Sequence, residues 1–328
     1  MTAMARFFSR ILPLWLCVGV VACQTVFTSG PPDELLAAGE NALQAKDYKQ
    51  AAKYFSAVKQ KHSESIEDEK ASFLFAETKR LQRYGSSSFK AYKDFAKRYP
   101  NSRYSVAAAE GEYKLGVAYF EKTLWGFLFF KPDPVAGARV MEHLQVNYRN
   151  FSLADDALMM TGDFFMERKS WESARTYFKQ LLAEYPRSKY VLRARYQFSR
   201  AVWRMNEGPD YDEKLLLDAR RGFLDFAAAV RSEGKTEELA EQLKSADEHV
   251  VKVNERLAKK QYRIGRFYER TKSPASAQHY YRYCLTEYPD TAAAKDCAKR
   301  LTALQKKLQP KPLPKGAEAS EKPEAGPA

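Results

Sequence analysis

The side chains that most often carry chemistry are few and scattered in this sequence of 328 residues. Its four histidines stand apart, and none is spaced as a metal ligand from another histidine or a cysteine. The sequence has no Gly-x-Ser-x-Gly elbow, phosphate-cradling loop or dinucleotide fingerprint. The adjacent carboxylates Asp155 and Asp156 begin a predicted helix, where acidic residues stabilise the helix dipole. We therefore expect no enzyme activity, no cofactor and no metal.

Cys23 stands where a covalent modification is expected. Arg6 and Arg10 precede an apolar stretch, residues 11–21, which is shorter than the roughly 20 residues of a membrane span but suits a signal peptide. Small residues followed by Cys23 resemble the lipobox of bacterial lipoproteins, in which the thiol and the new amine carry acyl chains that anchor the protein. Gln24, in place of Asp, implies transport to the outer membrane. The alternatives are an ordinary secretory signal with a chance cysteine, or an uncleaved anchor.

The chain is basic, and export limits what this charge can mean. Removing residues 1–22 takes away two arginines and no acidic residue, so the net charge falls from +13 to +11. Such a charge favours nucleic acid, anionic lipid or acidic partners. Export excludes nucleic acid as the normal partner. Because the basic residues recur at helical spacing, we interpret most of them as solvated helix faces that add attraction to a lipid surface.

Two further cysteines, Cys284 and Cys297, remain after export. Two thiols in an oxidising compartment can form a disulfide. They flank the turn at residues 288–290 about symmetrically, so an antiparallel helix pair would bring them to one level. The alternative is that Cys284 fills an apolar position in the core.

One pattern of residues recurs along the chain and predicts its fold. A small residue is followed by a large apolar or aromatic residue at +4, another at +7 and Tyr at +11, often with Pro next; positions 0, +4, +7 and +11 share one face of an α-helix. Pro then ends the helix, because the residue before it is driven out of the α region. The clearest copies start at Ser88, Ala174 and Ala277, and weaker ones start at Ala51, Gly137 and Ala219.

Each of these template helices follows another helix of similar length, so the sequence predicts helix pairs. The spacing from Ala51 to Ser88, and from Gly137 to Ala174, is 37 residues. Ser102, Ser188 and Thr291 are suited to cap the helices that come next. The predicted first helices of the pairs are 35–45, 67–84, 106–122, 153–168, 190–206 and 257–271. The fold class is therefore all-α, a tetratricopeptide-like solenoid of about five to six helix pairs.

Segments that lengthen the period also carry expectations. A connecting loop holds four aromatic residues that either contact a partner or fold back over the core: Trp125, Phe127, Phe129 and Phe130. Residues 232–255 are predicted to form one long charged helix, continuous with 257–271, and residues 292–308 a capping helix. We divide the chain into a signal peptide (1–22), a lipidated linker (23–33), a repeat domain (34–308, with N-terminal repeats to about 150) and a disordered tail (309–328).

The combination of lipidation signal, helix pairs and Tyr-Pro turns resembles the BamD-like outer-membrane assembly lipoproteins, a tetratricopeptide-repeat family. The residues that carry the likeness are in the first repeat, the turns, the loop before the third template helix and the last repeat: Pro31-Pro32-Asp33-Glu34, Asp47-Tyr48, Tyr99-Pro100-Asn101-Ser102, Gly126-Phe127, Asp133-Pro134, Tyr185-Pro186-Arg187-Ser188, Phe267-Tyr268 and Tyr288-Pro289-Asp290-Thr291. The charged insertion and the long tail exceed what a compact member of this family needs.

This resemblance implies a lipoprotein that faces the periplasm and scaffolds the β-barrel assembly machinery. Its partners would be the barrel-forming subunit, other assembly lipoproteins and unfolded outer-membrane proteins. By position, Phe75, Lys79 and Arg83 on the first helix of the second pair are candidates for substrate contact, and Arg266 and Arg270 are candidates for docking to the barrel-forming subunit. The alternatives are a scaffold for another envelope machine, such as a secretin, pilus or cell-wall complex.

Overall fold

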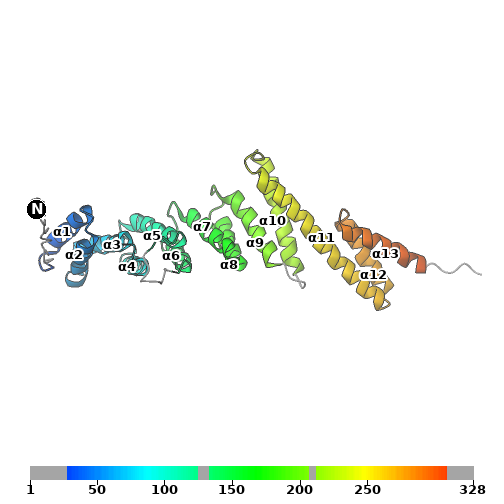
Figure 1. The fold of residues 1–328 in the computed structure, drawn as a ribbon, viewed down its shortest axis with the longest axis horizontal. Helices are drawn as coiled ribbons and strands as arrows, with labels where there is room; N and C mark the ends of the chain where they lie inside the picture. Colours follow the sequence, from blue (N-terminus) through cyan, green and yellow to red (C-terminus); the bar gives the residue numbers. More distant parts are fainter. Residues whose placement is uncertain (1–27, 125–132, 207–211, 309–328) are drawn as a thin grey trace, which may run out of the picture. The chain divides into compact units, whose positions relative to one another are not determined.

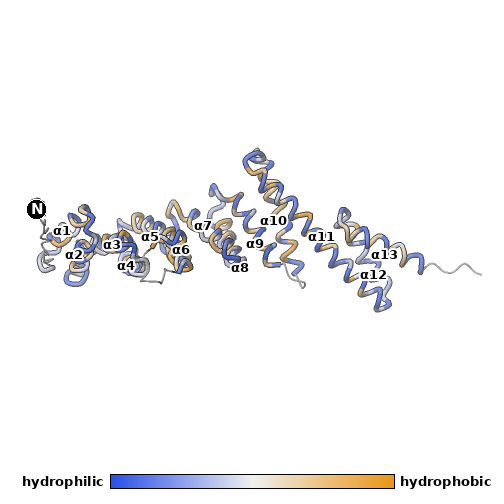
Figure 2. Tube along the Cα trace, viewed as in Figure 1, coloured by the Kyte–Doolittle hydropathy of each residue, from blue (hydrophilic) through white to orange (hydrophobic). Residues whose placement is uncertain are grey.

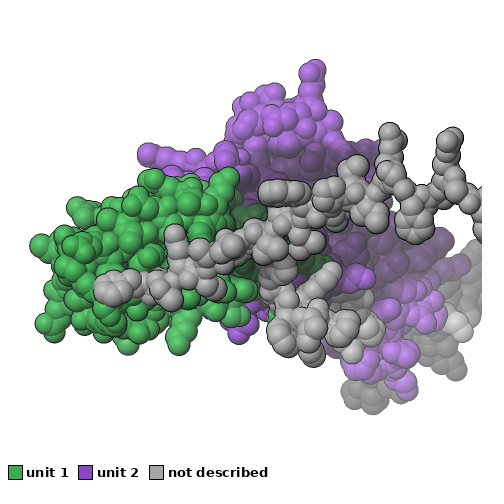
Figure 3. All heavy atoms as spheres, turned by 60° about the vertical axis from the view of Figure 1, so that its left-hand side comes forward, with its two compact units in different colours: residues 1–133 green, residues 134–328 purple. Residues whose placement is uncertain are grey.

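The computed structural model describes residues 28–124, 133–206 and 212–308, and within these ranges the chain is entirely helical. The helices fall into two compact units, residues 1–133 and 134–328, which are coloured separately in Figure 3. The all-α fold of successive helix pairs is thus confirmed. The cysteine of the lipidation signal, the aromatic loop at 125–130 and the tail from 309 lie outside the described residues.

The first unit holds two complete helix pairs and the first helix of a third. Its helices are α1 (Pro32–Gln44), α2 (Tyr48–Lys61), α3 (Ile66–Leu81), α4 (Gly85–Arg98) and α5 (Ser105–Phe120). Neighbouring helices pack against each other along the chain, and α5 also contacts α3. Hydrophobic and hydrophilic segments alternate along these helices (Figure 2), as expected when one face of each is buried.

The second unit continues the series and ends in longer helices (Figure 1). Its helices are α6 (Val135–Asn147), α7 (Ala154–Glu167), α8 (Trp171–Glu184), α9 (Val191–Met205), α10 (Glu213–Ser232), α11 (Ala240–Arg270), α12 (Pro274–Glu287) and α13 (Ala292–Leu308). The predicted continuity of the charged insertion with the helix after it is confirmed, because α11 is one helix of 31 residues. The predicted start at residue 232 is wrong, because α10 ends at Ser232 and residues 233–239 form the turn before α11. The predicted capping helix is α13, which packs on α12 and α11.

Small residues of the first helix set the spacing within a pair. Gly39, Gly162 and Gly265 each lie sixteen residues before the aromatic of the template helix that covers them. A Cβ atom on Gly162 would lie 2.4 Å from the ring of Phe178, and one on Gly265 would lie 2.5 Å from Tyr281. The aromatic ring therefore occupies the space that a side chain would need. Each such ring is wholly buried, which contributes about 2–3 kcal/mol to folding.

The turns inside the pairs use basic residues in a left-handed conformation. In each turn, the backbone N–H of the second residue after the C-cap donates to a carbonyl oxygen in the last turn of the helix. For example, Ser170 N donates to Phe165 O at 2.9 Å. This pattern is a Schellman-type helix ending. A positive charge at this place also favours the negative end of the helix dipole. All the described non-glycine residues with positive φ are of this kind: Lys46, Arg83, Lys122, Lys169 and Lys272.

The Tyr-Pro turns between pairs are fixed by side-chain hydrogen bonds. Tyr99 donates to the buried carboxylate of Asp68 at 2.6 Å, and Arg98 pairs with the same carboxylate at 2.9 Å. Burial and the contact with Asp68 raise the pKa of Tyr99 to about 12, so its hydroxyl keeps the proton that it donates. The turn is thereby attached to the start of the preceding first helix.

The predicted helix caps are right at one turn and wrong at two. Thr291 precedes α13 and its hydroxyl accepts the N–H of Ala294 at 3.1 Å, as an N-cap does. Helices α5 and α9 have Tyr104 and Tyr190 at their N-caps, so Ser102 and Ser188 lie before the caps. Ser188 instead donates to Asp155 at 2.6 Å, and Ser102 donates to a glutamate of α3. These serines connect the turn to the previous pair.

We predict that Gly162→Ala destabilises the protein by about 1–3 kcal/mol, because the new methyl group overpacks the contact with Phe178. The higher helix propensity of alanine offsets at most about 1 kcal/mol of this. The double variant Gly162→Ala, Phe178→Leu should lose less stability than the two single losses combined, as measured by chemical unfolding. Strictly additive losses would show that the ring does not set the spacing of the helices.

Candidate functional site

The residues predicted for substrate contact lie in the first unit, and the structure brings two of them together. Phe75, half buried on α3, packs against the core cluster of the first pair. The Nζ atoms of Lys59 and Lys79 lie 4.5 Å and 5.1 Å from the centre of its ring. Burial lowers the pKa of Lys59. Two cations beside one aromatic ring make a surface that suits acidic and aromatic side chains.

Arg83 does not belong to this helical surface as predicted. Helix α3 ends at Leu81, and Arg83 is the turn residue with φ of 61° that joins α3 to α4. Its side chain is exposed, but it belongs to the turn and not to the helix that carries Phe75. The sequence misled because Lys79 and Arg83 have the i, i+4 spacing of one helix face.

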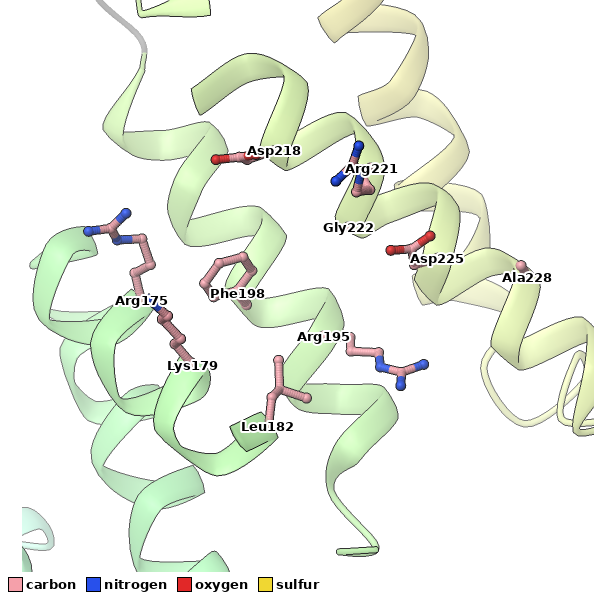
Figure 4. Close-up of a pocket in the computed structure, with 10 residues that line it drawn as sticks. All are labelled: Arg175, Lys179, Leu182, Arg195, Phe198, Asp218, Arg221, Gly222, Asp225 and Ala228. Atoms are coloured by element: carbon pink, nitrogen blue, oxygen red, sulfur yellow. The ribbon is translucent and has the colours of Figure 1, made fainter. Parts of the chain in front are cut away.

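In the second unit, three helices enclose a groove of about 700 Å³ (Figure 4). Phe198 of α9 lies between α8 and α10, and Leu182 of α8 adds a second apolar side chain. Charged residues from all three helices surround them: Arg175 and Lys179 from α8, Arg195 from α9, and Asp218, Arg221 and Asp225 from α10.

The charges around this groove are largely uncompensated. Arg175 pairs with Glu172 at 2.6 Å. For Lys179, Arg195 and Arg221, no ion pair forms within the described ranges 28–124, 133–206 and 212–308. Cations outnumber the two carboxylates around the apolar centre, so the groove can hold an acidic peptide with one large apolar side chain. These basic residues are scattered along the sequence, although Arg195 and Phe198 have the i, i+3 spacing of one helix face.

A second groove, of about 500 Å³, lies between α9, α10 and α11. Its polar side chains are held in place by one another: Arg193 donates to Asp163 at 2.6 Å, and Gln197 donates to the same carboxylate at 3.3 Å. Arg200 donates to Gln197 at 2.9 Å. Burial raises the pKa of Asp163. Such preformed amide and guanidinium donors suit the backbone of an extended peptide.

The residues predicted for docking lie at the end of α11. Arg270 is exposed and has no ion pair among the residues that the structure describes, whereas Arg266 lies 3.8 Å from Glu269. Glu269 joins three helices, since it also accepts hydrogen bonds from Tyr281 at 2.9 Å and from Arg300 at 2.6 Å. Burial alone would raise the pKa of Glu269, but these donors hold it below its ordinary value. Of the two arginines, Arg270 is therefore the one available to a partner.

The remaining candidate residues are either buried in the core or lie outside the residues that the structure describes. Cys284 and Cys297 are both buried free thiols. The described residues contain no cluster of three metal-ligating side chains, and none of their helices is long and apolar enough to cross a membrane. Cys23, the lipidation candidate, and the four aromatic candidates of the loop lie outside the described residues: Trp125, Phe127, Phe129 and Phe130.

The successive helix pairs have a tetratricopeptide-like arrangement. Residues 156–188, which span α7, α8 and the following Tyr-Pro turn, match the family model of the tetratricopeptide repeat. Residues 241–321 match the family model described as outer membrane lipoprotein, YfiO. This second match includes α12, α13 and nearly all of α11. The resemblance to BamD-like repeat lipoproteins is thus confirmed over the C-terminal part of the chain.

Solved repeat proteins are distant in sequence. A structure of the MamA protein is 14% identical over 63% of this chain and 95% of its own, with a TM-score of 0.36. The C-terminal part of a repeat protein from Cytophaga hutchinsonii is 14% identical over 81% of this chain and 87% of its own, also with a TM-score of 0.36. No curated protein matches the chain.

We predict that Glu269→Gln lowers the stability at pH 7 by about 1 kcal/mol, a value reduced for the partial exposure of Arg300. The pKa of Glu269 is lowered by folding, so its contribution is present above the ordinary glutamate value of about 4.3 and is lost as the pH falls below it. Urea unfolding between pH 7 and pH 3 measures this. The exposed Glu287→Gln serves as the control, and a deficit in Glu269→Gln that persists at pH 3 would contradict the assignment.

Proposed function

We propose that this protein is a lipid-anchored scaffold of the β-barrel assembly machinery at the outer membrane, facing the periplasm. It binds unfolded outer-membrane proteins and the barrel-forming subunit, and so promotes folding and insertion. The observation that carries the proposal is the match of residues 241–321 to the outer membrane lipoprotein family. The lipidation signal at Cys23 supports the same location.

The C-terminal end of the repeat domain is proposed to dock on the barrel-forming subunit. Helices α11, α12 and α13 lie within the family match and form one core with α10. The Glu269 network keeps these helices in a fixed arrangement, so their surface is preformed. Arg270 gives this surface a positive charge that pairs with no carboxylate of the described residues. A carboxylate of the partner would pair with it. Such an ion pair orients the two proteins and speeds their association more than it raises their affinity.

The first unit is proposed to receive the unfolded substrate. The C-terminal strand of an outer-membrane protein alternates apolar with polar side chains and ends in the carboxylate of the chain. Phe75 offers an aromatic surface, and Lys59 and Lys79 beside it offer positive charge. Because these groups belong to adjacent helices α2 and α3, their spacing is fixed by the first two helix pairs.

Co-purification with a variant at Arg270 tests the docking proposal. Arg270→Glu should lower recovery of the barrel-forming subunit by about five-fold or more, since about 1 kcal/mol is lost with one exposed ion pair. Arg282→Glu on α12 is the matched control, because Arg282 is also exposed and without an ion pair in the described part of the chain. It should leave recovery unchanged.

Three outcomes of this experiment would count against the proposal. Equal recovery with both variants would remove Arg270 from the docking surface. Loss with both would point to a general effect of charge. Recovery of secretin, pilus or cell-wall components in place of the barrel-forming subunit would assign the scaffold to another envelope machine.

A further inference from the structure

Two buried positions recur at five of the six places where a template helix meets the helix after it; the exception is α10, which the charged insertion follows. The first is the +7 position of the template, and the second lies thirteen residues later in the next helix. In the earlier repeats a large residue is followed by alanine, and each of these residues is at most 1% exposed: Val58 and Ala71, Phe95 and Ala108, Leu144 and Ala157, Leu181 and Ala194. At the last junction the equivalent pair is Cys284 and Cys297, both wholly buried.

These two cysteines are in direct contact. Helices α12 and α13 pack against each other as an antiparallel pair across the turn at residues 288–291 (Figure 1). The thiol of Cys297 hydrogen-bonds the sulfur of Cys284, which in turn donates to the carbonyl oxygen of Ala258 at 3.7 Å. Both belong to the main core cluster of the second unit. An alanine at the equivalent positions of other repeats indicates that the two helix backbones come close here, as a disulfide requires.

We propose that Cys284 and Cys297 form a disulfide that fastens the capping helix α13 to α12. The proposal rests on the proposed export to the periplasm, an oxidising compartment in which disulfides persist. Neither cysteine is needed as a thiol by the proposed binding function. The bond would close a loop in the last described hairpin, where α13 packs on α11 and α12 among the described helices and local opening costs little.

The reaction requires an oxidant of the thiol–disulfide oxidoreductase class. The thiolate of Cys284 attacks a sulfur of the oxidant's disulfide, and one oxidant thiol leaves. The thiolate of Cys297 then displaces the second oxidant sulfur. Two electrons and two protons pass from the cysteine pair to the oxidant, which ends as a dithiol. The hydrogen bond from Cys297 lowers the pKa of Cys284, which favours Cys284 as the first nucleophile.

Burial decides when this reaction takes place and how long its product lasts. An oxidant cannot reach the two sulfur atoms in the closed hairpin, so the bond forms during folding or when α13 opens. Once closed, the disulfide is shielded from reductants in the same way. We therefore expect it to behave as a structural bond and not as a redox switch.

A count of free thiols in the full-length protein from cell envelopes tests the proposal. The protein is quenched in acid, denatured and alkylated before and after reduction, and its peptides are weighed. The peptides with Cys284 and Cys297 should be alkylated only after reduction. Alkylation of both without reduction would overturn the disulfide. The Cys23 peptide gives an independent result, since its added lipid mass reports the anchor whether or not the disulfide forms.

A variant that copies another repeat separates the bond from the packing. The double variant Cys284→Val, Cys297→Ala places at the last junction the same residue types as Val58 and Ala71 of the first, and it should fold. After it is unfolded in reductant and refolded with the reductant present, the natural protein should have a thermal midpoint roughly 5–10 °C lower, the change expected for opening a loop of this length. The variant should not respond to reductant. An equal response from both proteins would overturn the proposal.

Discussion

The close approach of the two helices in a pair is the constraint on which the rest of this structure depends. It requires a residue without a side chain, or with a small one, directly under an aromatic ring sixteen residues later. Gly162 under Phe178 and Gly265 under Tyr281 show the contact most clearly. Because the ring fills the groove beside the small residue, the pair has one spacing and one register. Stacking such pairs then buries successive apolar clusters along each unit.

The connections preserve this register. Within a pair, a basic residue in the left-handed conformation reverses the chain. Glycine is the usual residue at this position. A basic side chain is favourable here because it interacts with the negative end of the helix dipole. Between pairs, Tyr99 and its bond to Asp68 fasten the turn to the previous first helix. Few of the exposed side chains take part in these contacts. The faces around Phe198 and Arg270 are therefore free to differ from those of other repeat proteins and to specify a partner.

The repeat could be derived from the sequence because burial imposes a regular spacing. The template residues, the continuity of α11 and the extent of α13 were all predicted from that spacing. Features fixed by backbone conformation or by contacts distant in sequence were not. Arg83 has helical spacing but lies in a turn, and Ser188 has the composition of a cap but bonds Asp155. The groove around Phe198 joins three helices, and no single segment of the sequence contains its pattern.

Crosslinking in living cells is the most direct test of the proposed function, that this repeat scaffold binds the components of barrel assembly. Photoreactive residues would replace Phe75 and Arg270, with exposed Arg282 as the control position, and the captured proteins would be identified by mass. The account predicts unfolded outer-membrane proteins at position 75, the barrel-forming subunit at position 270, and neither at position 282. Capture of secretin or pilus components at 75 and 270, without the barrel-forming subunit, would contradict it.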